Sequence, residues 1–182
     1  MMNSSPGEKV GGAVTLGLLA AWAAHDAEEV AALPGWLRRN VPALRERFPA
    51  VPEAVWRRAG SLHTREFAVA VGVMGAVVAA TSAAGYATGG RSAVYQTALN
   101  GFGLHGLVHL AQAAVVRGYT PGAATSPVLV VPFTLWARRR LRRAGVLRPA
   151  RRDLALGLGL AGAATAVSHA VARRVTPPRK CS

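Results

Sequence analysis

Long apolar blocks alternate with short arginine-rich gaps along the chain. A helix of about 20 apolar residues spans the hydrocarbon core of a bilayer, and several blocks approach or exceed this length. The blocks cover residues 10–33, 62–84, 93–116, 124–137 and 154–172. The pattern predicts an all-α fold, a polytopic membrane helical bundle of about five transmembrane segments. The fourth block is short and contains two prolines, so it either spans or is re-entrant.

The same pattern predicts one domain with polar ends. We expect residues 1–9 to be disordered, residues 10–172 to form a single membrane-embedded helical domain, and residues 173–182 to form a basic tail. The first block also has features of a signal peptide that would be cleaved before His25. The apolar pattern resumes after that point, which favours a membrane span.

The polar segment over residues 34–61 has a distinct composition. Pro34 and Gly35 are expected to end the first helix, and later prolines should break the segment into short pieces. Trp36 and Trp56 are interleaved with arginines. This mixture is typical of an interfacial segment that lies on lipid headgroups with tryptophans as anchors.

The formal net charge is +14, and arginine supplies almost all of the cationic side chains. The arginines lie in the gaps between apolar blocks, where they would meet anionic lipid headgroups. A high genomic G+C content, which favours arginine, alanine and glycine codons, also contributes. We find no nucleic-acid-binding motif or basic face with stacking aromatics, so no nucleic-acid partner is expected. The sequence predicts an integral protein of a bacterial cell membrane, with the bilayer as its partner.

The first apolar block is interrupted by His25-Asp26-Ala27-Glu28-Glu29. A charge near the centre of a membrane helix costs about 2.5–3.5 kcal/mol on insertion scales. The cluster must therefore be paired, protonated, hydrated or bound to a metal. Positions i, i+3 and i+4 share a helix face, so His25, Glu28 and Glu29 lie together, with Asp26 at the edge of that face.

Two further segments carry similar faces. His63 and Glu66 are spaced i, i+3, and His105 and His109 are spaced i, i+4. With a rise of about 1.5 Å per residue, all three sets fall in the same half of the bilayer. We therefore expect them to face one another inside the bundle.

Some of these residues have equally simple structural explanations. Ser61 would cap a helix that begins near His63, and Glu66 would interact favourably with its dipole. His169 stands alone in the fifth block and is expected to be a hydrogen-bonded packing residue. The role of Asn100 stays open.

Imidazole and carboxylate together suit zinc, iron or manganese, and helical bundles commonly build such sites from inward-facing side chains. The sequence supplies enough ligands for one or two divalent ions. The predicted metal ligands are His25, Glu28, His63, His105 and His109. The predicted catalytic carboxylates, as general base, bridging ligand or supporting partner, are Glu29, Glu66 and Asp26.

The motif His25-x-x-Glu28-Glu29 resembles the signature of the HXXEE-motif integral membrane protein family. Members of that family also carry a later His/Glu pair, matched here by His63 and Glu66, and a later segment with asparagine and histidine. The resemblance covers roughly residues 10–170. It implies a membrane fold and a polar site, and it names no reaction.

Four functions are compatible with this pattern. The first is a metal-dependent membrane-embedded enzyme that hydrolyses or oxidises a lipid-like or apolar substrate. The second is a metal-free acid–base enzyme, such as an isoprenoid cyclase or isomerase, that uses a buried carboxylic acid. The third is a proton or metal-ion transporter, although the polar residues cluster at one depth. The fourth is a structural or assembly subunit in which the polar side chains only hold helices together.

Overall fold

The computed structural model describes residues 10–176, with the backbone alone for residues 150–158, 160 and 161. Every regular element in this part of the chain is helical, which confirms the all-α prediction. The helices are α1 (Gly12–Thr15), α2 (Gly17–Arg47), α3 (Glu53–Gly60), α4 (Thr64–Ala87), α5 (Ala93–Val116), the π-helix η1 (Ser126–Val130), α6 (Val131–Arg143) and α7 (Ala150–Val175). The predicted disorder of residues 1–9 and the end of the predicted tail lie outside the described residues.

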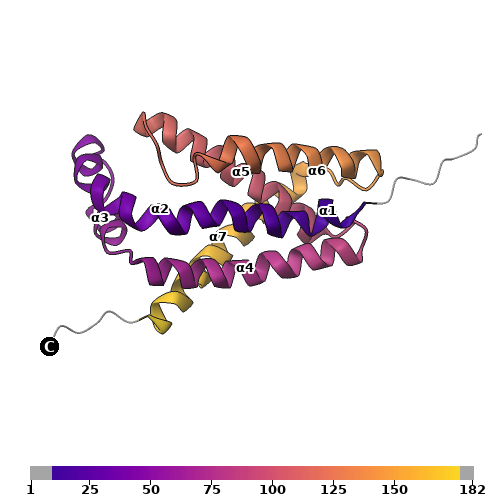
Figure 1. Cartoon of the computed structure of the whole chain (residues 1–182), viewed down its shortest axis with the longest axis horizontal. Helices are drawn as coiled ribbons and strands as arrows, with labels where there is room; N and C mark the ends of the chain where they lie inside the picture. The colour runs from indigo at the N-terminus through magenta and orange to yellow at the C-terminus, as the bar shows by residue number, and fades with distance from the viewer. Residues whose placement is uncertain (1–9, 177–182) are drawn as a thin grey trace, which may run out of the picture.

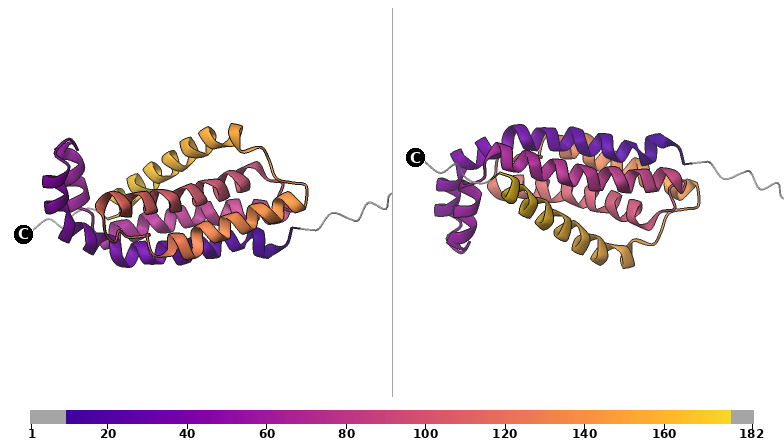
Figure 2. Two further views of the ribbon diagram at one scale, coloured as in Figure 1. Left: turned by 90° about the horizontal axis from the view of Figure 1, so that it is seen from above. Right: turned by 90° about the horizontal axis from the view of Figure 1, so that it is seen from below.

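The long helices form an elongated bundle (Figure 1). Helix α2 packs against α4 and η1, while α5 packs against η1 and α6. Helix α7 crosses the bundle obliquely and packs against α4 and α5 (Figure 2). Helices α2 and α5 carry most of the predicted site residues, and both of them pack against η1.

The apolar core lies where α1, α2, α5 and α6 meet. It is formed by side chains from all of these helices and from η1, namely Val14, Leu18, Ala21, Tyr95, Leu99, Phe102, Val130, Ala137 and Leu141. Small residues let α5 approach η1 and α6 closely. A Cβ at Gly106 would lie 2.7 Å from Cγ1 of Val130, and one at Gly103 would lie 2.6 Å from Cγ2 of Thr134. This close approach fixes the orientation of α5 relative to η1 and α6, and with it the position of His109.

The first helix is longer than the sequence predicts. The expectation that Pro34 ends it is wrong, because α2 continues through Pro34 and Pro42 to Arg47. A proline removes a helical hydrogen bond and bends the helix, but tertiary contacts can hold the next turns. Here Trp36 Nε1 donates to the carbonyl of Tyr119 at 2.9 Å. Arg47 donates to the carbonyls of Val115 and Val116 at 3.0 and 2.8 Å, and its guanidinium thereby caps the end of α5.

The later boundaries differ less. Helix α5 has the predicted ends, whereas α6 continues past residue 137 into the arginine-rich gap after the fourth apolar block. Pro127 lies in the first turn of η1, where a missing N–H breaks no helical bond, and Pro132 follows directly after the wider π-turn. Arginine is a good helix former and is favourable in a last turn. The C-terminal end of α2 and the whole of α3, drawn in violet, lie across one end of the bundle (Figure 2).

By length and hydropathy, only α4 among the described helices qualifies as a membrane span, with a mean hydropathy of 2.0. This measure does not support the predicted five-span bundle. The helices that carry the polar cluster score lower because histidine and carboxylate side chains interrupt their apolar sequences. The length and composition of α4 alone are weak grounds for a membrane location.

Candidate metal centre

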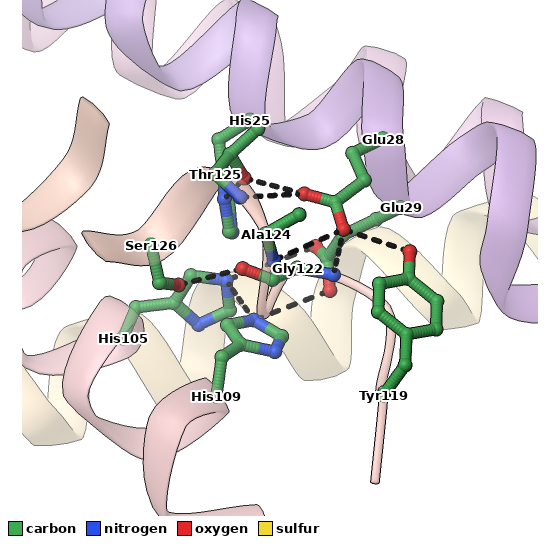
Figure 3. A network of polar contacts seen from close by, with 10 residues as sticks. All are labelled: His25, Glu28, Glu29, His105, His109, Tyr119, Gly122, Ala124, Thr125 and Ser126. Atoms are coloured by element: carbon green, nitrogen blue, oxygen red, sulfur yellow. Dashed lines mark hydrogen bonds and ion pairs between the residues drawn. The ribbon is translucent and has the colours of Figure 1, made fainter. Parts of the chain in front are cut away.

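Two helices position the central group of side chains. Helix α2 contributes His25 and Glu29, and α5 contributes His105 and His109 (Figure 3). One candidate ligand atom from each of the four lies within 4.8 Å of the others. We call these four residues the ligand group. The i, i+4 spacing places both members of each pair on one face of its helix.

The distances within the ligand group suit a single metal ion. His109 Nε2 lies 2.9 Å from His105 Nε2 and 3.3 Å from a Glu29 carboxylate oxygen. His105 Nε2 lies 3.7 Å from the other Glu29 oxygen. Metal bonds of about 2.0–2.1 Å in tetrahedral geometry separate ligand atoms by about 3.3–3.4 Å. The observed separations bracket that value.

His25 supplies an independent indication of a missing partner. Its side chain is fully buried, and its ring centroid lies 5.1 Å from those of His105 and His109. Nδ1 lies 2.6 Å from Thr125 Oγ1, whereas Nε2 has no hydrogen-bond partner among the described residues. An unsatisfied buried polar group costs about 1–3 kcal/mol. A cation bound between the three imidazoles would satisfy it, so the residues fit a metal.

The ligand group is buried on one side and open on the other. His25, Glu29 and His109 are buried, but the His105 side chain is 44% exposed. The group therefore meets the surface of the bundle at His105.

Glu28, predicted as a ligand, lies outside this group and faces the loop that precedes η1. Its Oε1 accepts from the Tyr119 hydroxyl at 2.8 Å and from the N–H groups of Gly122 and Ala124 at 3.1 and 3.4 Å. Its Oε2 accepts from the N–H and hydroxyl of Thr125 at 2.9 and 2.7 Å. Glu28 therefore fastens the loop over residues 117–125 to α2 (Figure 3).

The loop contacts the ligand group directly at Gly122. This glycine has a φ of 85°, and a Cβ there would lie 2.7 Å from Nδ1 of His109. Only a residue without a side chain fits both the backbone conformation and the close ring. Gly122 therefore limits the positions that the His109 ring can take.

The structure does not bring His63 and Glu66 to the ligand group. His63 is the exposed N-cap residue of α4, and Glu66 is buried and paired with Arg58 of α3. The predicted pairing of these residues with the other sets fails because a nearer guanidinium neutralises Glu66. Asp26 is buried beside the group, and its Oδ1 has no hydrogen-bond partner among the described residues.

Sequence reasoning missed Tyr119, Gly122 and Thr125. Residues 119–122 were recognisable as a turn, but no spacing rule indicates which helix a loop will fold against. Partial burial and the hydrogen bond to Glu28 raise the pKa of Tyr119 to about 12. Its hydroxyl thus stays a proton donor to Glu28 at neutral pH.

Asn100 and His169 also lie outside the ligand group. Asn100 Oδ1 accepts a hydrogen bond from Arg138 of α6. The His169 ring stacks against Phe67 of α4, with centroids 6.3 Å apart. Both residues connect helices of the bundle.

Fold and site together define an all-helical protein with a cluster of three histidines and a carboxylate between two helices. Residues 16–137 match the family described as "Protein of unknown function with HXXEE motif", and the chain belongs to that family. The motif is His25-x-x-Glu28-Glu29, which supplies two members of the ligand group and the loop contact at Glu28. Comparisons with curated proteins and with solved structures gave no significant match.

Proposed function

We propose that this protein is a membrane-embedded enzyme that binds one divalent metal ion through the ligand group and acts on a lipid-like or apolar substrate. The observation that carries the proposal is the convergence of four ligand atoms within 4.8 Å, beside a buried His25 Nε2 with no protein partner. Three histidines in such close contact are otherwise unfavourable, because each imidazole has a nitrogen that needs a partner.

Three imidazoles and one carboxylate suit zinc, iron or manganese. Four protein ligands fill a tetrahedral zinc site, whereas a six-coordinate iron or manganese ion keeps positions for water or substrate. A bound metal would supply Lewis-acid activation of water for hydrolysis, or oxygen activation if it is iron. Iron would therefore leave both reactions open and manganese would favour hydrolysis, whereas zinc would activate water only by taking a fifth ligand.

Asp26 is the best-placed proton acceptor among the carboxylates. It follows His25 on α2, is buried, and has an oxygen with no partner among the described residues. It also interacts electrostatically with Glu29 and His105. Glu66 is less suited to the role because Arg58 already occupies its carboxylate.

The outer surface of the bundle supports a membrane location. Monomeric soluble proteins rarely expose large contiguous apolar patches. Several helices here expose large apolar side chains, among them Val77, Leu107, Val108, Val115, Leu135, Trp136 and Val167. A bilayer would cover these faces. Leu107 and Val108 follow the exposed His105 on α5, so an apolar substrate would approach the ligand group from the lipid phase.

Elemental analysis of the purified full chain in detergent tests the metal site. We expect one equivalent of zinc, iron or manganese in the wild type, and little or none in His109→Ala and Glu29→Gln. The exposed His63→Ala variant is the matched control and should keep its metal. A folded wild type that binds none of the three metals, or a His109→Ala variant that binds as well as wild type, would refute the site.

Alkaline carbonate extraction tests the membrane location. We expect the full chain to stay with the membrane pellet, because its exposed apolar faces would lie in lipid. Complete release into the supernatant would contradict that part of the proposal and leave the metal site to be judged separately.

One observation favours a metal-free acid–base enzyme as the second candidate. With no cation bound nearby, burial would disfavour the charged form of Asp26, and the resulting carboxylic acid could donate its proton to an apolar substrate. Infrared difference spectra of wild type and Asp26→Asn would show a carboxylic acid band only if Asp26 is protonated. That band in a metal-free wild type favours this candidate over the metalloenzyme.

A further inference from the structure

We propose that Glu28 and Thr125 form a positioning relay that fixes His25 in the tautomer whose Nε2 lone pair faces the metal. The inference deepens the proposed function and rests on the metal site proposed there. It gives the two glutamates of the motif different tasks: Glu29 joins the ligand group, and Glu28 acts through Thr125 on the orientation of His25.

The relay begins with Glu28, which only accepts hydrogen bonds. Three of its partners are backbone N–H groups, of Gly122, Ala124 and Thr125, and a backbone N–H can only donate. The Tyr119 hydroxyl also donates to it. Glu28 therefore presents a carboxylate whose Oε2 is ready to accept the Thr125 hydroxyl proton at 2.7 Å.

The hydrogen bond from Thr125 to Glu28 determines how the Thr125 hydroxyl can interact with His25. A threonine hydroxyl has one proton and two lone pairs. Because that proton points to Glu28, the Thr125 oxygen can only accept toward His25 Nδ1, which lies 2.6 Å away. Nδ1 of His25 must then carry the hydrogen.

The consequence appears at the other ring nitrogen. A neutral imidazole with a proton on Nδ1 has its lone pair on Nε2. That atom is buried and has no partner among the described residues, and the ring faces His105 and His109. Histidine ligands of metals commonly donate their other N–H to an oxygen that sets tautomer and ring orientation. In this chain a loop hydroxyl, itself held by Glu28, supplies that oxygen.

The spacing of the motif explains why one helix can do both tasks. Glu28 and Glu29 are adjacent, so they are about 100° apart around α2. Glu29 points to the histidines of α5, while Glu28 points to the loop before η1 (Figure 3). Both remain within one turn of His25.

Zinc titration of the full chain in detergent, against a competing chelator, tests the relay. Thr125→Val keeps the shape and removes the hydroxyl, and we expect it to weaken zinc binding by about 10- to 100-fold. Thr125→Ser restores the hydroxyl and should return the affinity to within a few-fold of wild type. Thr120→Val is the matched control: Thr120 is a buried threonine of the same loop whose hydroxyl has no partner among the described residues, and its loss should leave zinc binding unchanged.

A zinc affinity in Thr125→Val equal to that of wild type would overturn the relay. So would a Thr125→Ser variant as weak as Thr125→Val while both stay folded, because a purely structural role would then explain the loss.

A second readout separates failure of the relay from failure of the metal site. If wild type binds no zinc, iron or manganese, the proposed function fails, but the relay still predicts the tautomer of His25. Nitrogen-15 spectra of histidine-labelled, metal-free protein should show a hydrogen on Nδ1 of His25 in wild type, and lose that preference in Thr125→Val. A wild type with the hydrogen on Nε2 would overturn the relay whatever the metal result.

Discussion

The bundle contains two pairs of a histidine and a glutamate at helical spacing, and their surroundings differ. On α2, Glu29 faces His105 and His109 of α5, at 3.7 and 3.3 Å between nitrogen and oxygen. At the start of α4, Glu66 is paired with Arg58, and His63 is exposed. Arg58 already pairs with the Glu66 carboxylate, whereas Glu29 lies beside two imidazoles, so the proposed metal site can use Glu29 and not Glu66.

The loop before η1 reinforces the contrast. It places Thr125 beside His25 and Gly122 beside His109, so two members of the ligand group are held from outside their own helices. His63 has no comparable support among the described contacts. We therefore expect the two pairs to respond differently to metal, to mutation of their partners and to mutation of their histidines.

Metal removal should give the largest effect on the ligand group. A ligand that binds only the folded state stabilises it by about 2.7 kcal/mol at 100 times its dissociation constant. We expect a chelator to lower the free energy of unfolding of the wild type by about this amount, measured by denaturation in mixed micelles. His63→Ala should lose as much as wild type. An equal loss in His109→Ala would show that the metal acts elsewhere.

Removing Arg58 should affect stability alone. The change Arg58→Ala leaves the buried carboxylate of Glu66 without its partner, which costs about 1–3 kcal/mol. Arg45→Ala is the control, because the Arg45–Glu53 pair at 2.9 Å is exposed on both sides and such pairs contribute about 0–1 kcal/mol. Metal content should stay at the wild-type value in both. Loss of metal in Arg58→Ala would place Glu66 in the centre after all.

Alanine substitutions at two glycines with positive φ distinguish the effect of backbone strain from the effect of contact with the His109 ring. Alanine at either Gly122 or Gly145 should cost about 1–2 kcal/mol, because both residues have left-handed backbone, with φ of 85° and 68°. At Gly145 nothing lies within 4 Å of the added Cβ, whereas at Gly122 the His109 ring does. Only Gly122→Ala should also weaken zinc binding, by about 10-fold if it acts like the loss of an outer partner. Equal zinc affinities in the two variants would contradict the role assigned to Gly122.

The smallest effect is expected at His63. Its side chain is exposed, and surface substitutions of this kind usually change stability by less than about 0.5 kcal/mol. His63→Ala should match wild type in thermal unfolding. A clear stability loss would mean that the start of α4 depends on the imidazole.

The sequence predicted the helices whose ends are marked locally and missed those decided by distant contacts. Helix α5 has its predicted ends because Ser92 caps its first turn and Arg117 takes a left-handed conformation after its last. The end of α2 was missed because Arg47 reaches carbonyls of α5, 68 and 69 residues further along the chain. Nothing near Pro34 indicates that contact.

The candidate site divides in the same way. Helical spacing indicated His25, Glu29, His105 and His109, because residues on one face of a helix stay together in any bundle. The separate task of Glu28 depends on a loop, and the loop depends on tertiary packing against α2. Spacing alone therefore indicated side chains that the structure brings together, but it did not separate the contacts of the two glutamates.

X-ray absorption of the metal-loaded full chain tests the central claim most directly. We predict nitrogen and oxygen neighbours at about 2.0–2.2 Å, with outer-shell scattering from three imidazole rings in wild type and from two in His105→Ala. A wild-type spectrum without imidazole scattering, or one unchanged in His105→Ala, would contradict the account.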